Sequence, residues 1–195
     1  MAKGTIYLHW KTREDLFTAL MKREYIRLAE DIQQRLAGDP EGGTLHALTK
    51  QSVLATMKSP LMKAVLLRDT DLLGEWVRKE YGSVNYSEQT AQSLGLFEHL
   101  RSRGVVRDDI DIHKQAYMLS AISMGFLVID QYMPDDFKYS DEEVVEMLTE
   151  SVKRTFAPPP PAGPQPDKET KQEASDNLSS YLDDILTFRR KQEEE

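Results

Sequence analysis

Several side chains near the start of the chain have the chemistry to contact a nucleic acid. Four of them are cationic or hydrogen-bonding and lie on one side of a short predicted helix: Lys3, Thr5, Tyr7 and His9. Arg13 adds a basic group at the start of the next predicted helix. Such groups at neighbouring helix N-termini suit backbone phosphates and groove edges. Residue types alone are a weak signal, because a solvated surface carries the same side chains.

The charge distribution places any nucleic-acid surface at the front of the chain. The net charge of -8 argues against a general polyanion binder. Residues 1–27 nevertheless hold six basic and three acidic groups, a local net of +3. Residues 167–195 hold nine acidic and five basic groups, a local net of -4.

Helix signals recur along residues 12–156, and no segment shows sustained strand alternation, so we expect an all-α fold. Thr12 and Ser140 each precede a carboxylate by three residues, the pattern of a helix N-terminal capping box. Gly104 is the expected left-handed end of a helix over 87–103. The other expected helices cover 12–37, 44–57, 60–67, 69–84, 111–132 and 140–156.

The composition changes after residue 156. Residues 157–166 are rich in proline and predict a semi-rigid spacer, and residues up to 176 are expected to be disordered. An amphipathic helix is predicted over 177–192 because Leu178, Leu182 and Ile185 fall on one apolar stripe. So short a helix is marginal alone, so we expect it to dock on its own chain or on a partner.

The front segment resembles the recognition helix of the tetracycline-repressor (TetR) family of bacterial transcriptional regulators. The resemblance is carried by residues that match the family's pattern directly: Lys3, Gly4, Thr5, Tyr7, His9, Glu14 and Leu16. Milder replacements occupy four further positions, at Ile6, Trp10, Thr12 and Arg13. The resemblance implies DNA contacts by Lys3, Thr5, Tyr7 and His9 and a phosphate contact by Arg13. Trp10 is expected to pack in the core.

In this family two further helices precede the recognition helix, whereas this chain begins at the recognition helix itself. We therefore expect a chain that lacks the front of its helix-turn-helix domain. Residues 1–36 would be the remnant of that domain with a connecting long helix, and residues 37–156 would be a helical ligand-binding and dimerisation domain.

The resemblance also implies a homodimer and a small apolar or amphipathic effector that releases the repressor from its operator. The last two helices of the domain would pair with those of a second copy. The expected interface residues are Met118, Ala121, Ile122, Gly125, Ile129, Val145, Leu148 and Val152, with packing inside one chain as the alternative. Candidate residues for the effector pocket are Met57, Trp76, Phe97 and Tyr117, because aromatic and thioether groups line adaptable apolar cavities.

Other chemistry is poorly supported by the residues. The sequence has no cysteine, which excludes disulfides and cysteine nucleophiles. The donors at 108–113 are better explained as a loop and a helix cap than as a metal site, and no catalytic constellation can be drawn. We expect a cytoplasmic protein with no cofactor, no catalytic residues and no membrane span. A helical ligand-binding and dimerisation module that does not bind DNA remains the alternative function, and an enzyme is the least favoured.

Overall fold

The computed structural model describes residues 9–66, 73, 85–159 and 168–194. Over these residues the chain is all-helical with no strand, which confirms the predicted fold class. The α-helices are α2 (Arg13–Ala37), α3 (Leu45–Lys58), α4 (Pro60–Leu66), α7 (Asn85–Ser102), α8 (Ile112–Val128), α9 (Asp141–Phe156) and α10 (Lys168–Glu194). Two short 3-10 helices, η1 (Ile129–Gln131) and η2 (Asp135–Phe137), lie between α8 and α9. Most of the recognition-helix segment lies outside the described residues.

The ends of several helices are fixed by local capping contacts. The Thr12 hydroxyl accepts the Asp15 N–H at 3.0 Å, and the Asp15 carboxylate accepts the Thr12 N–H at 3.0 Å. Ser140 and Glu143 form the same box at the start of α9. Gly104 follows α7 with φ of 66°, a backbone conformation that a residue without Cβ adopts without strain. These predicted boundaries are confirmed.

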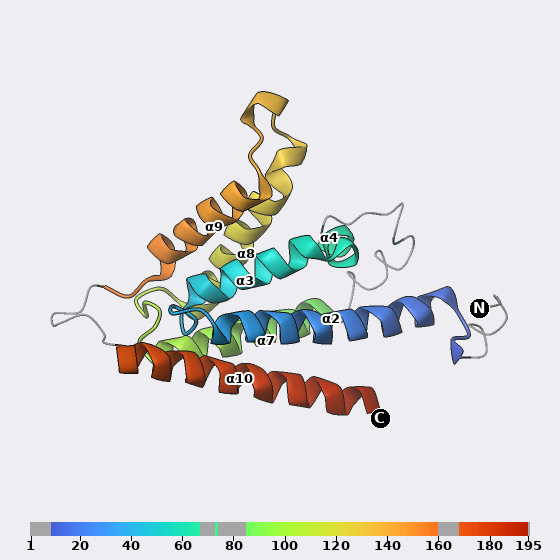
Figure 1. The fold of residues 1–195 in the computed structure, drawn as a ribbon, viewed down its shortest axis with the longest axis horizontal. Helices are drawn as coiled ribbons and strands as arrows, with labels where there is room; N and C mark the ends of the chain where they lie inside the picture. The colour runs from blue at the N-terminus through green and yellow to red at the C-terminus, as the bar shows by residue number, and fades with distance from the viewer. Residues whose placement is uncertain (1–8, 67–72, 74–84, 160–167, 195) are drawn as a thin grey trace.

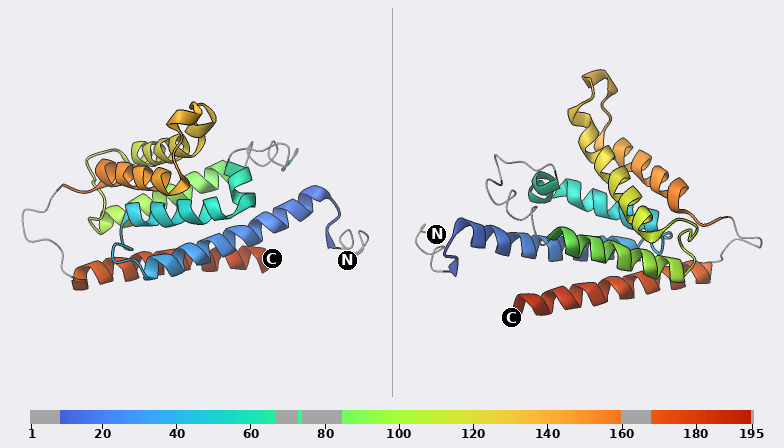
Figure 2. Two further views of the ribbon diagram at one scale, coloured as in Figure 1. Left: turned by 45° about the horizontal axis from the view of Figure 1, so that its top comes forward. Right: turned by 180° about the vertical axis from the view of Figure 1, so that it is seen from behind.

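The helices form a layered bundle with one projecting hairpin (Figures 1 and 2). The long helix α2 and the terminal helix α10 run antiparallel along one side of the molecule, with α3 against α2 and α7 against α8 (Figure 1). Helices α8 and α9 pair as a hairpin whose connecting end points away from the other helices (Figure 1). The base of α9 packs on α3, so one half of the hairpin is anchored in the body.

Two apolar clusters hold the bundle together. The larger joins α2, α3, α7, α9 and α10 through fully covered side chains such as Leu36, Phe97 and Phe156. The smaller gathers Met21, Met62 and other residues near the front half of α2. Burial of a large apolar side chain stabilises the fold by about 1.5–3 kcal/mol relative to leaving that side chain exposed to water. Helix α2 runs through both clusters and is the spine of the fold.

The terminal helix differs from the sequence prediction in length. Helix α10 begins at Lys168, so the disorder expected over 167–176 is wrong from residue 168 onward. The reason is tertiary packing: Ser175 is buried against the backbone of Gly42 and Gly43 in the turn between α2 and α3. Further along, the Gln33 amide donates to the Ser179 carbonyl at 3.4 Å. The helix therefore docks on its own chain, one of the two expected outcomes.

Candidate functional site

The segment expected to contact DNA is only partly within the described residues. Lys3, Thr5 and Tyr7 lie outside them. His9 is helical and exposed, and its ring lies 5.8 Å from the half-buried Trp10 ring at an angle of 54°. Arg13 is the first residue of α2, directly after the capping residue Thr12. The structure thus places residues 9–13 at the front end of the spine helix, away from α9 (Figure 1).

Helix α8 has an uncovered apolar face. Of the five interface residues expected on this helix or just after it, Ala121, Gly125 and Ile129 are exposed, whereas Met118 and Ile122 are half-buried. A Cβ added at Gly125 would meet no atom within 4 Å. By length and composition alone, the segment Ile112–Gln131 could cross a membrane. An 18-residue stretch of it has a mean hydropathy of 1.2, and 11% of that stretch is buried. An apolar helix this exposed has a surface available for a partner.

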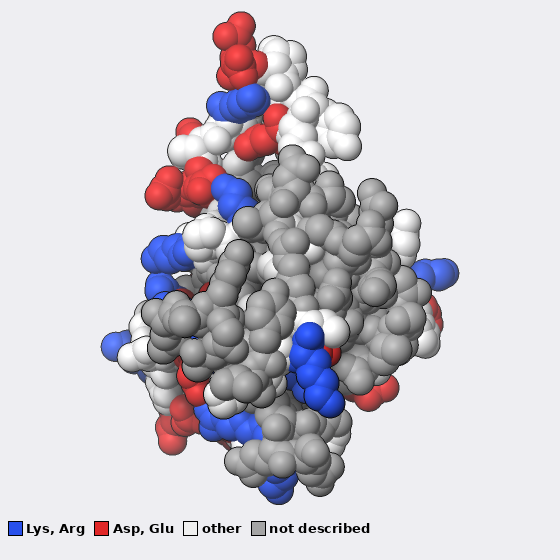
Figure 3. Space-filling model, turned by 90° about the vertical axis from the view of Figure 1, so that its right-hand side faces the viewer, with Lys and Arg blue, Asp and Glu red and all other residues white. Residues whose placement is uncertain are grey.

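The connecting end of the hairpin continues this exposed surface with aromatic side chains. Tyr132, Phe137 and Tyr139 are all exposed there. Lys138 pairs with Asp135 at 2.6 Å beside them. Figure 3 shows acidic side chains next to uncharged ones at this end, which forms the top of the molecule. Exposed apolar side chains next to charged ones are typical of an interaction surface.

On α9 the interface prediction is wrong. Val145, Leu148 and Val152 are 2%, 0% and 0% exposed within a single chain. The apolar stripe of α9 packs on the body, chiefly on α3, and belongs to the larger core cluster. These three side chains therefore have no surface to offer a second copy.

The predicted effector-pocket residues that the structure describes do not line a shared cavity. Trp76 lies outside the described residues. Phe97 is fully covered and packs on Phe156 with ring centroids 5.5 Å apart. Tyr117 is 76% exposed on α8, and Met57 is half-buried against the core. None of the described three lines either of the two hollows of the bundle that are described below. This prediction is wrong because Phe97 and Met57 pack in the core and Tyr117 lies on the surface of α8.

A groove of about 440 Å³ lies instead between α2, α3, α7 and α10. Its walls are mainly apolar, from Leu28, Ile32, Leu48, Leu96, Leu182 and Ile185. Polar side chains also face it, among them Ser52 and Gln92. A volume of this size, with few polar groups in an apolar lining, is typical of a small-molecule site. Sequence reasoning missed it because α10, which forms one wall, was not expected to lie there.

Two titratable side chains adjoin the groove where α7 meets α10. The His99 ring stacks on the Tyr181 ring with centroids 4.5 Å apart and an angle of 22°. Burial lowers the pKa of His99, and the nearby Arg103 charge adds to this effect. Burial likewise raises the pKa of Tyr181, with a further contribution from Glu98. Both rings are therefore favoured in their uncharged forms.

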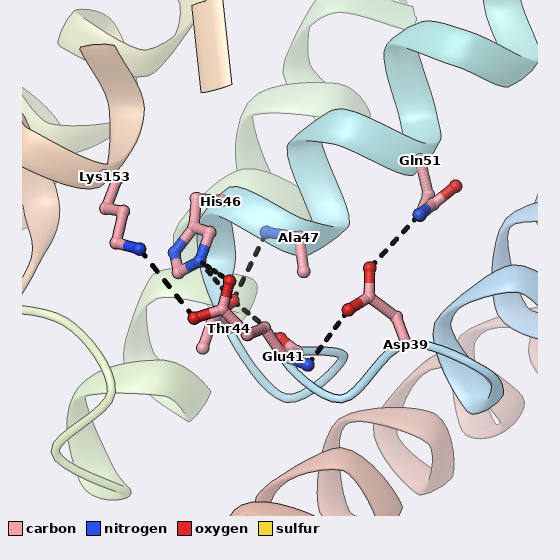
Figure 4. Close-up of polar contacts among 7 residues, drawn as sticks. All are labelled: Asp39, Glu41, Thr44, His46, Ala47, Gln51 and Lys153. Carbon is pink, nitrogen blue, oxygen red and sulfur yellow. Dashed lines mark hydrogen bonds and ion pairs between the residues drawn. The ribbon is translucent and has the colours of Figure 1, made fainter. Parts of the chain in front are cut away.

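A polar cluster organises the turn between α2 and α3 (Figure 4). The Glu41 carboxylate lies 3.2 Å from His46 Nε2 and 3.8 Å from Lys153 Nζ on α9. The hydrogen bond from His46 is the main cause that lowers the pKa of Glu41. The Thr44 hydroxyl donates to the Glu41 carbonyl at 2.7 Å and accepts the Ala47 N–H at 3.3 Å. The cluster connects the turn to α9. In the sequence, its one visible sign is Thr44, the N-terminal cap of α3, two positions before His46.

The described residues offer no group of three His, Asp or Glu side chains that could hold a metal ion. In the 108–113 segment, Asp109 pairs with Arg107 at 2.6 Å. Asp111 accepts the N–H groups of His113 and Lys114 at 3.1 Å each and caps α8. The prediction of a loop with a helix cap is confirmed.

Comparison of the chain with family models, curated proteins and solved structures finds no match in any of the three.

Proposed function

We propose that this chain is a homodimeric, ligand-responsive transcriptional regulator of the TetR kind. The observation that carries the proposal is the uncovered apolar face of α8, with Ala121 and Gly125 exposed at its centre. Small residues let two helices approach closely, and a second copy of the same face would cover the apolar surface. The resemblance of residues 3–16 to a recognition helix supports the DNA-binding part of the proposal.

Helix α2 connects the parts that such a regulator needs. It begins at Arg13, within the stretch 3–16 that resembles a recognition helix and its following turn, and it contributes Leu28 and Ile32 to the groove. An effector in the groove that fits one tilt of α2 better than another would shift the population of the two arrangements. Because dimers read half-sites at a fixed spacing, a change of tilt in both copies would weaken DNA binding.

A second candidate is a helical ligand-binding and dimerisation module with no DNA role. The net charge of -8 favours it, because a negative protein repels a polyanion outside its basic segment. Both candidates require the α8 interface, and they differ only in the front segment.

Sedimentation velocity tests the dimer. The wild-type chain should sediment as a dimer, and Gly125→Arg should sediment as a monomer because a charge is placed in the apolar contact. Thr187→Arg, on the exposed side of α10, is the matched control and should remain dimeric. A monomeric wild-type chain would overturn both candidates.

A salt titration of duplex-DNA binding then separates the two candidates. For a DNA-binding regulator, log affinity should fall steeply with log salt, since binding releases counterions from the phosphates. The Lys3→Ala/Arg13→Ala variant should flatten that slope by about two, one for each phosphate that is no longer neutralised. A dimer without any salt-sensitive DNA binding would establish the module and refute the regulator.

A further inference from the structure

A second cavity, of about 300 Å³, lies where four parts of the chain meet. These are the turn between α2 and α3, the connection between α7 and α8, the end of α9 and the start of α10. Its floor is apolar and comes from core side chains: Leu45, Val106, Val152 and Phe156. It shares no lining residue with the groove under α10, so it is a separate site.

The rim of this cavity carries more positive than negative charge. Arg103, Lys153 and Lys171 face it, against a single carboxylate from Glu41. That carboxylate already has two partners, because His46 lies at 3.2 Å and Lys153 at 3.8 Å (Figure 4). Within the described part of the chain, Arg103 and Lys171 form no ion pair. Arg103 and Lys171 are both exposed, so their charges are accessible to a ligand at the rim of the apolar cavity.

The start of α10 closes this cavity on one side. Ala174 lines it and also packs against Gly43 in the turn between α2 and α3. Lys171, one turn earlier on the same face of α10, brings its charge to the rim. A ligand held here would contact the body and α10 together and would strengthen their contact.

We propose that this cavity binds a small amphipathic carboxylate, with its apolar body on the floor and its carboxylate between Arg103 and Lys171. Burial of the ligand's methylene groups against the apolar floor favours binding. A guanidinium and an ammonium group both form charge-assisted hydrogen bonds with a carboxylate. A cationic ligand would meet like charge, and an uncharged one would leave both cations without a partner. The inference goes beyond the proposed function and does not depend on DNA binding.

Isothermal titration of the full chain with decanoate tests the proposal. We expect saturable binding of one decanoate per chain. Arg103→Gln/Lys171→Gln should weaken it by about tenfold or more, because the carboxylate then has neither of its charged partners. The matched control, Lys114→Gln/Lys191→Gln, removes two exposed charges from other parts of the surface and should change affinity by less than about twofold. Binding of 1-decanol should be the same in all three proteins.

A second measurement locates the ligand. In methyl NMR spectra, decanoate should shift the Val105, Val106 and Val152 resonances and leave those of Leu96 and Leu182 in the groove unchanged. The proposal is overturned if decanoate shows no saturable binding, if both double variants bind it equally, or if the groove leucines shift instead. Both substituted pairs are exposed, so circular dichroism should show the wild-type fold in every protein.

Discussion

The contact between α10 and the turn between α2 and α3 is tight enough that a single methyl group should disturb it. A Cβ at Gly43 would lie 2.5 Å from the Ala174 carbonyl carbon and 2.6 Å from the Ser175 nitrogen. These are backbone atoms of α10, so no side-chain rotation relieves the clash, and the helix itself must move. Overpacking of this kind costs about 1–3 kcal/mol. We therefore expect Gly43→Ala to lower the free energy of unfolding by about that amount.

Urea unfolding measures the loss of overall stability, and hydrogen exchange measures the loosening of α10. The unfolding midpoint should fall, and amides of α10 should exchange faster than in the wild-type chain because Leu178 and Leu186 lose part of their cover. Gly38→Ala is the matched control, since its nearest atom lies 3.7 Å away at the Arg35 carbonyl oxygen, an ordinary contact. It should change stability by no more than about 0.5–1 kcal/mol. Equal midpoints for the two variants, with unchanged exchange in α10, would refute the tight docking of α10 on this turn.

Three further predictions concern the core, a cap and a titratable ring. Phe156→Ala removes a side chain that is 1% exposed and packs on Phe97, and should cost about 3–5 kcal/mol in urea unfolding. Ser140→Ala removes the N-terminal cap of α9 and should cost about 0.5–2 kcal/mol. In NMR titration it should also raise the pKa of Glu143, which the hydrogen bonds from Ser140 hold below its ordinary value. Because burial lowers the pKa of His99, the unfolded chain binds more protons between that pKa and the ordinary value of 6.5. Stability should therefore rise with pH through this window, and urea midpoints of His99→Gln at pH 5.0 and 7.5 should differ less than those of the wild-type chain.

The features that sequence predicts well are local. Caps at Thr12 and Ser140 and the left-handed Gly104 depend on residues within one turn, so their patterns are visible without the fold. The start of α10 depends on Gly43, which lies far away in sequence. Because Gly43 has no Cβ, the backbone of Ala174 can pack directly against it. Composition alone therefore predicts disorder where the structure has a helix.

The surfaces and cavities are less predictable, because they depend on which face of a helix another helix covers. The stripes of α8 and α9 look alike in sequence, yet Leu148 is fully covered whereas Gly125 is exposed. The groove depends on α10 lying antiparallel to α2, which no local pattern encodes. Phe97 is a reasonable pocket residue by type, but its ring packs on Phe156.

Disulfide cross-linking at the α8 face tests the proposed dimer most directly. The chain has no cysteine, so a single introduced thiol can form a disulfide only with a second copy. Such a bond needs Cα atoms within about 7 Å. We predict that Gly125→Cys or Ala121→Cys forms a covalent dimer rapidly on mild oxidation, whereas Thr187→Cys on α10 remains monomeric. Cross-linking at both α8 positions that is no faster than at residue 187 would contradict the proposed interface.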